Sequence, residues 1–243
     1  MTARTATVGI GQKLSHGMPW LDDVAATMEK VFAPVLGQDA PRGPRDLLYA
    51  TWLGHSLHAA IVAVPIGAWT ATMIFDLFGE ERAADLTLGL GLLGAAGAAV
   101  TGAAQWQDTT NDEAPRRLGA LHAVLNYAAT GLMAGSWLMR QQGQRKAGVA
   151  FSTLGLGVNL ASAWLGGELA YDLGIGVNHA AFEKPPSRWT DVAALDDLRD
   201  GKPQRVEAKG TPVLLLRQGD RIRAIGATCP HLGGPLDEGQ IEG

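Results

Sequence analysis

Four apolar stretches dominate the middle of the chain. Residues 53–75, 86–107, 118–139 and 147–167 contain no Asp, Glu, Lys or Arg. Each stretch is about 20 residues long, which is the length a helix needs to cross a hydrocarbon layer about 30 Å thick. The pattern predicts a mainly α membrane four-helix bundle, and we assign it to a domain at residues 47–182.

Two of these stretches carry residues that predict how the helices bend and pack. Pro65 and Gly67 should kink the first, because Pro65 lacks an amide proton and its ring crowds the preceding turn. Gly94, Ala98 and Gly102 recur every four residues in the second. Small residues on one helix face let a neighbouring helix approach closely, so we interpret these three as a packing surface.

The N-terminal segment, residues 1–46, contains an amphipathic pattern. Apolar residues between positions 19 and 36 follow the i, i+3, i+4, i+7 spacing of a helix with one apolar face. Gly37 is a suitable residue to end it. The sequence leaves two placements open: the helix lies along the membrane surface, or it packs against the bundle.

The periodicity changes from helical to extended towards the C-terminus. Residues 183–187 contain consecutive prolines, so they predict a short, stiff linker. In the following domain, residues 188–243, an apolar strand at 213–216 and alternating residues at 221–225 flank a turn signal. We therefore expect a β-hairpin that leads directly to Cys229.

Composition and charge narrow the class of protein. The net charge is −4 and no basic tract is present, which argues against nucleic-acid binding. Cys229 is the single cysteine, so it is either a free thiol or a metal ligand. No apolar core followed by a small-residue cleavage site occurs at the N-terminus, and we expect no removable signal peptide.

Three histidines belong to the predicted bundle. In an up-down bundle His55, His58 and His122 all fall in the first turns of helices that start on the same side of the membrane, here called side A, at similar depth given 1.5 Å of rise per residue. His55 and His58 are spaced i, i+3, and His122 and Asn126 are spaced i, i+4, so each pair should share a helix face.

The histidines support three hypotheses. Ionisable residues inside a membrane are candidates for function by default. His122 opposite His55 or His58 could provide the axial ligands of haem b or a metal. The same side chains could hydrogen-bond a quinone, or they could merely cap helix ends and bond across the bundle.

The orientation in the membrane follows from Lys and Arg near the helix ends. More of them flank side A than the opposite side, side B. The positive-inside rule therefore favours side A, with both termini, in the cytoplasm. We expect an integral protein of a bacterial cell membrane that contacts lipid.

Several short motifs carry a resemblance over residues 47–179. They are Gly54-His55 to His58, Pro65-Ile66-Gly67 with Asp76, His122, and Gly166-Gly167-Glu168-Leu169-Ala170-Tyr171 leading to Gly174-Ile175-Gly176-Val177. In these residues the chain resembles a bacterial four-helix membrane family of uncharacterised function, whose members are sometimes fused to Rieske or cytochrome domains. The resemblance implies a fold and a membrane location, and no established reaction.

A second motif surrounds the cysteine. Cys229 and His231 are two residues apart, so in a turning loop a thiolate and an imidazole can both point towards iron. The prolines and glycines around them permit a tight loop whose backbone amides can donate hydrogen bonds to sulfur, which raises the potential of a cluster. The motif is Cys229-Pro230-His231-Leu232-Gly233-Gly234-Pro235-Leu236.

With this motif, residues 188–243 resemble the first half of a domain from the bacterial ferredoxin-like branch of the Rieske family. Further likeness lies at Trp189 with Asp191-Val192-Ala193, Leu198 with Asp200-Gly201, and Val213-Leu214-Leu215-Leu216-Arg217. The resemblance implies a partial all-β Rieske-type domain with a [2Fe–2S] cluster. Cys229 would bind the iron that has two thiolates, and His231 the iron that has two imidazoles.

The sequence departs from the Rieske pattern after this loop. A second Cys-x-x-His pair should follow, but the 12 residues after His231 contain neither Cys nor His. Either the chain is part of a longer protein, with the second pair beyond Gly243, or the product has lost its cluster. We favour the first explanation.

These observations predict a membrane-anchored one-electron carrier that exchanges electrons with a redox partner protein, a haem or a quinone. The alternative is a channel or transporter-like bundle, lined by Asp76, Asn126, Asn159 and the histidines, with the Rieske domain as a redox sensor. Scarce charge in mid-membrane argues against that alternative. A terminal oxygenase component is a weaker hypothesis, because no separate mononuclear-iron motif is visible.

Overall fold

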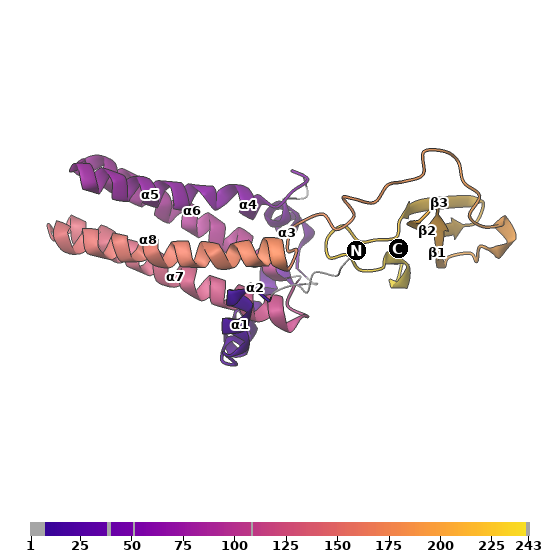
Figure 1. Ribbon diagram of the computed structural model, residues 1–243, viewed down its shortest axis with the longest axis horizontal. Helices are drawn as coiled ribbons and strands as arrows, with labels where there is room; N and C mark the ends of the chain where they lie inside the picture. The colour runs from indigo at the N-terminus through magenta and orange to yellow at the C-terminus, as the bar shows by residue number, and fades with distance from the viewer. Residues whose placement is uncertain (1–7, 38–39, 51, 108, 242–243) are drawn as a thin grey trace. The chain divides into compact units, whose positions relative to one another are not determined.

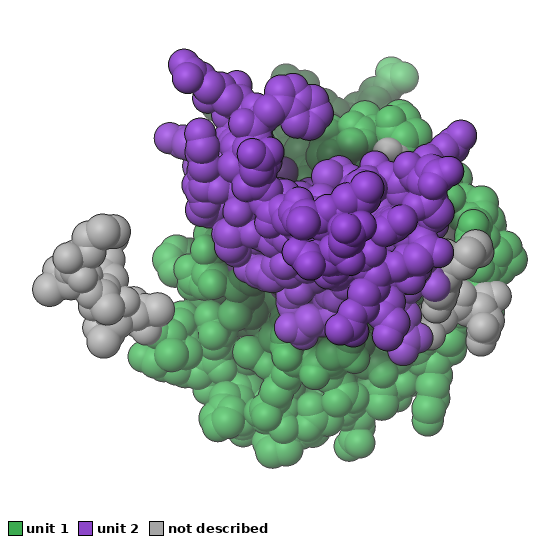
Figure 2. Space-filling model, turned by 90° about the vertical axis from the view of Figure 1, so that its right-hand side faces the viewer, with its two compact units in different colours: residues 1–173 green, residues 174–243 purple. Residues whose placement is uncertain are grey.

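The structure is a computed structural model that describes residues 8–241, apart from 38–39, 51 and 108. The chain divides into two compact units, residues 1–173 and residues 174–243 (Figure 2). The first unit is helical and the second contains a β-sheet. Residues 1–7 and 38–39 of the expected N-terminal segment lie outside the described residues.

Four long rods form the first unit. The helix pair α4 (Leu57–Ile61) and α5 (Ala63–Phe78) makes one rod, and α6 (Glu81–Gln107), α7 (Glu113–Gln141) and α8 (Arg145–Gly167) make the others. Figure 1 shows α5 to α8 running side by side, with three shorter helices at one end. These are α1 (Ile10–His16), α2 (Leu21–Leu36) and α3 (Arg42–Tyr49). The predicted four-helix bundle is confirmed.

Among the described residues, three helical segments are long and apolar enough to cross a membrane. They are Leu57–Phe78, Glu81–Gln107 and Arg145–Asp172, the last of which includes the π-helical turn η1 (Glu168–Asp172). The fourth rod, α7, is 29 residues long but is not among them. Its polar residues, such as His122 and Asn126, lower its mean hydropathy. It packs closely with α8 and α6.

The first rod is interrupted at Val62, as the proline predicts. Pro65 has no amide proton to donate to the carbonyl of Ile61, so the regular helix breaks between α4 and α5. The start of the rod differs from the expectation. It begins at Leu57 rather than at residue 53, because Gly54 adopts a φ of +79° and turns the chain.

The small residues of α6 pack against the first rod. A Cβ atom at Gly94 would lie 2.7 Å from Val64 Cγ1, and one at Gly102 would lie 2.7 Å from His58 Cε1. Between them, the carbonyl oxygen of Ala98 accepts a hydrogen bond from His58 Nδ1 at 2.9 Å. The predicted packing surface is confirmed, because side chains at these positions would push the two helices apart.

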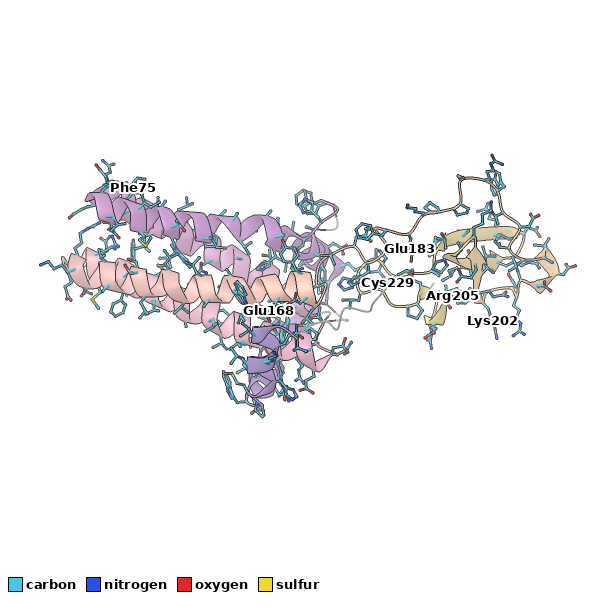
Figure 3. The ribbon with its side chains drawn as sticks, viewed as in Figure 1. Phe75, Glu168, Glu183, Lys202, Arg205 and Cys229 are labelled. Atoms are coloured by element: carbon cyan, nitrogen blue, oxygen red, sulfur yellow. The ribbon has the colours of Figure 1, made fainter. Side chains whose placement is uncertain are left out.

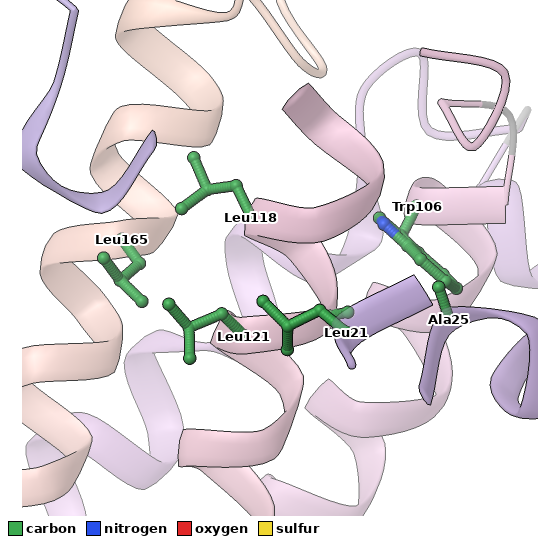
Figure 4. Close-up of a cluster of buried hydrophobic side chains, with 7 residues drawn as sticks. Leu21, Ala25, Trp106, Leu118, Leu121 and Leu165 are labelled. Atoms are coloured by element: carbon green, nitrogen blue, oxygen red, sulfur yellow. The ribbon is translucent and has the colours of Figure 1, made fainter. Parts of the chain in front are cut away.

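The amphipathic helix α2 packs against the bundle. Its residues Leu21 and Ala25 are fully buried in a cluster with residues of α6, α7 and α8 (Figure 4). The buried members of that cluster are Leu21, Ala25, Trp106, Leu118, Ala120, Leu121 and Leu165. At the edge, Arg117 Nη2 donates to Asp22 Oδ2 at 2.7 Å, and this hydrogen bond lowers the pKa of Asp22. Of the two expected placements, the structure has the packed one.

The second unit contains an antiparallel sheet in the order β1-β2-β3. The strands are β1 (Pro203–Ala208), β2 (Thr211–Gln218) and β3 (Arg221–Gly226). The expected hairpin is confirmed, with Gly219 at a φ of +61° in its turn. Strand β1 was not predicted, because its mostly polar sequence gives little alternation. The unit agrees with the expected partial Rieske-type domain.

Candidate functional site

The predicted ligand residues lie in a tight loop directly after β3. The amide of Cys229 donates to the carbonyl of Gly234 at 2.8 Å, and the amide of Gly233 donates back to the carbonyl of Cys229 at 2.8 Å. Gly233 has a φ of +72°, a conformation that favours glycine. The two hydrogen bonds close the loop that carries Cys229 and His231.

The donor set of this loop fits half of a Rieske site. Cys229 is a half-buried free thiol, and His231 follows two residues later. In the described part of the chain, no group of three or more His, Cys, Asp or Glu residues could hold a metal ion. One thiolate and one imidazole are the donors that the sequence predicts for this loop.

Two residues that the sequence reasoning did not assign to a site contact this loop. The amide of His179 donates to the carbonyl of Pro230, between the two predicted ligands, at 3.0 Å. The hydroxyl of Thr228 donates to the carboxylate of Glu183. Figure 3 shows Glu183 near the loop that carries Cys229. No signal in the sequence singles out either contact.

The bundle histidines do not all lie as expected. His55 is in the turn before α4, so it does not share a helix face with His58, and that prediction is wrong. His122 and Asn126 do share a face, and Asn126 Nδ2 donates to His122 Nε2 at 3.0 Å. His122 Nδ1 donates to the carbonyl of Ser162 at 2.8 Å. The bond to Ser162 crosses the bundle from α7 to α8, as one of the three hypotheses expects, whereas the bond from Asn126 lies within α7.

A chain of amides continues from His122 into α8. Asn159 Nδ2 donates to Asn126 Oδ1 at 3.3 Å. Asn159 is only 5% exposed, and its Oδ1 atom has no hydrogen-bond partner among the described residues. An unpaired acceptor inside a bundle is costly in free energy. The Oδ1 atom of Asn159 could therefore accept a hydrogen bond from a water molecule or another donor.

Comparison with known proteins identifies the two parts of the chain. A family model described as a predicted membrane protein (DUF2231) matches residues 54–179, just over half of the chain. The chain belongs to the DUF2231 family. A model of the Rieske [2Fe–2S] domain matches residues 188–243. The chain therefore carries a DUF2231 membrane domain followed by a Rieske domain, as the two resemblances imply.

Curated relatives match the Rieske part. The chain is 38% identical over 56 residues to the oxygenase component of a 3-ketosteroid-9-alpha-monooxygenase from Rhodococcus rhodochrous, which covers 23% of this chain and 14% of that protein. A probable oxygenase component from the same organism is 34% identical over 64 residues, which are 24% and 16% of the two chains. The chain spans less than a fifth of the length of these relatives. No solved structure matches.

The DUF2231 domain contains a buried ion cluster that the sequence reasoning missed. The side chain of Arg140, near the end of α7, is only 1% exposed and bonds both carboxylate oxygens of Asp76 at 2.8 and 2.5 Å. Arg140 also reaches Asp85 at 3.1 Å, and Arg145 binds both aspartates. The up-down topology could have revealed it, since all four residues fall on side B.

A second buried carboxylate of the DUF2231 domain holds the N-terminal helix. Glu168 is 7% exposed and accepts hydrogen bonds from the amides of Gly11 at 3.0 Å and Gln12 at 3.2 Å. Trp164 Nε1 donates to the same carboxylate at 3.1 Å. The contacts satisfy amides of the first turn of α1, which have no partner within their own helix. Glu168 thus fastens α1 to the bundle.

Proposed function

We propose that this protein is a membrane-anchored one-electron carrier whose [2Fe–2S] cluster is held in part by Cys229 and His231. The observation that carries the proposal is the closed loop bearing these two donors, inside the region that matches the Rieske domain. When bound, such a cluster accepts and returns one electron, at a higher potential than all-cysteine ferredoxin clusters have.

The residues of the loop have separate tasks in this proposal. The Cys229 thiolate and the His231 imidazole would each bind one iron, as in the Rieske family. The left-handed conformation of Gly233 turns the backbone. The amides of Gly233 and Cys229 then donate the two hydrogen bonds that close the loop. The second ligand pair would come from residues outside this sequence. The bundle keeps the carrier at the membrane.

The first test is a spectrum of the native protein. Membranes from cells that express the native gene, reduced with dithionite, should show the EPR signal of a Rieske cluster, which differs from that of an all-cysteine cluster because imidazole replaces thiolate on one iron. Membranes from cells without the gene are the control. Absence of any Rieske signal in the first sample would refute the proposal.

A haem b or quinone near His55, His58 and His122 is our proposal for the electron partner within the membrane. A ligating histidine usually donates its other ring N–H to a carbonyl. His58 has this arrangement, because its Nδ1 is bonded to Ala98, so Nε2 is the nitrogen for an iron or a quinone oxygen. His122 would have to release Asn126 first.

A reduced-minus-oxidised absorption spectrum of the purified protein tests the haem. With haem b bound through His58, we expect a Soret difference band that disappears in His58→Ala and persists in His16→Ala, which changes an exposed histidine outside the long rods. If the unmodified protein shows no Soret change, haem is ruled out as the partner and the quinone alone stays in the proposal.

Two further expectations accompany this proposal. We propose that both termini lie in the cytoplasm, on the balance of Lys and Arg at the helix ends. The redox partner outside the membrane is a protein whose identity the loop chemistry does not specify. The transporter hypothesis gains no support from Asp76, since Arg140 and Arg145 bind its carboxylate.

A further inference from the structure

The first residues of the second unit contact the ligand loop. Residues 174–187, here called the connector, belong to the same compact unit as the loop. From the sequence, residues 183–187 are expected to form a short, stiff linker. The structure gives the connector three hydrogen bonds to the sheet and the loop, and their donors and acceptors lie on both sides of Cys229.

The first contact is at His179. Its amide donates to the carbonyl of Pro230 at 3.0 Å. Its ring lies against Gly233, where a Cβ atom would stand 3.4 Å from Nδ1. The ring itself is held in place, because Nε2 bonds the carbonyl of Gly174 at 3.0 Å. His179 therefore touches the loop at two points that flank His231.

The second contact is at Glu183 and Lys184. The carboxylate of Glu183 accepts a hydrogen bond from the hydroxyl of Thr228, the residue before Cys229. The carbonyl of Lys184 accepts one from the hydroxyl of Thr211 at 2.6 Å, at the start of β2. The connector is thus fixed to the sheet as well as to the loop. A segment with these contacts cannot move without moving Cys229 or breaking them.

We propose that the connector is the outer support of the ligand loop, and that His179 and Glu183 are positioning residues for Cys229 and His231. The inference rests on the proposed function, because it gives these two ligands their role. The match to the DUF2231 model ends at His179. The last residue of the membrane-family signature is therefore part of the support of the Rieske loop.

Support of this kind matters for a redox centre. The potential of an iron–sulfur cluster depends on hydrogen bonds to sulfur and on its exposure to solvent. A loop that is free to open would change both. Loss of the connector contacts should therefore shift the potential and increase the mobility of the loop, even where the sheet stays folded.

The single cysteine permits a test that does not need the cluster. The rate of Cys229 alkylation by iodoacetamide in the detergent-solubilised chain reports how often the loop opens. Thr228→Val and Glu183→Gln each weaken or remove one hydrogen bond, so we expect the rate to rise about fivefold, the change for one typical bond. His179→Ala, which removes the ring, should act in the same direction.

Matched controls separate loop support from general damage. Thr228→Ser keeps the hydroxyl, and Glu238→Gln changes an exposed carboxylate of the same unit, so both should alkylate at the unmodified rate. Amide exchange in β2 shows whether the sheet is intact. If Glu183→Gln and His179→Ala keep the sheet and alkylate at the unmodified rate, the inference is wrong.

The native holoprotein distinguishes failure of the inference from failure of the proposed function. There, His179→Ala and Thr228→Val, which leave every carboxylate in place, should shift the midpoint potential of the Rieske signal, whereas Glu238→Gln should not. If the unmodified protein has no Rieske signal, the proposed function fails, whatever the alkylation rates. If the signal is present and both variants keep the original potential, the positioning role fails alone.

Discussion

Replacing Cys229 by serine is expected to abolish the Rieske EPR signal of the native protein. The serine hydroxyl is not ionised near neutral pH and is a harder ligand than thiolate, so it is a poor substitute on an iron–sulfur cluster. Cys229 is the single cysteine of this sequence, and no neighbouring thiol of the same segment can replace it. The measurement is EPR of dithionite-reduced membranes, normalised to the amount of protein.

Thr228→Ser is the control for this experiment. It introduces serine at the adjacent position and keeps the hydroxyl that bonds Glu183, so the signal should keep its shape and intensity. A Rieske signal of unchanged intensity in Cys229→Ser would show that the cluster has other ligands. In that case both the ligand assignment and the role of the closed loop would have to be abandoned.

Replacing Arg140 by methionine is expected to destabilise the bundle by about 3–5 kcal/mol, the range for removing one partner of a buried ion pair. The change leaves Asp76, whose side chain is 4% exposed, with Arg145 as its remaining cationic partner among the described residues. It also leaves the hydroxyls of Ser136 and Ser152 without the guanidinium. Reversible unfolding in mixed micelles, monitored by helical circular dichroism, gives the free energy.

Two further variants are compared with Arg140→Met in the unfolding measurement. Arg82→Met removes an exposed arginine at the start of α6 and should change the free energy of unfolding by no more than about 0.5 kcal/mol. Arg140→Met combined with Asp76→Leu replaces the pair with apolar side chains, and it should recover most of the loss, because no buried charge is stranded. A single variant as stable as the unmodified protein would show that the cluster contributes little.

Most of the bundle could be predicted from local features of the sequence. A run of about 20 residues without charge is itself enough to require a helix in a bilayer, since every backbone amide must find its partner within the segment. The break before Pro65 and the close packing at Gly94 and Gly102 are also local. Each follows from what a single residue lacks, an amide proton or a side chain.

The start of the first rod could not be predicted in this way. The absence of charge continues back to Leu53, but Gly54 takes a left-handed conformation and the helix begins at Leu57. The hydropathy of a segment carries no information about its backbone dihedral angles. The consequence for the site is direct, because His55 lies outside the helix that carries His58.

The donors of the ligand loop and the contacts that support the loop differ in how far they could be predicted. The donors Cys229 and His231, the glycines that turn the loop and the hairpin before it are neighbours along the chain, so a local motif was sufficient to predict them. The bonds of His179 to Pro230 and of Glu183 to Thr228 join residues far apart in the chain. Tertiary structure decided those contacts, as it decided the pairing of Arg140 with Asp76. Local pattern fixes what a residue can do, whereas its partner depends on how distant segments pack together.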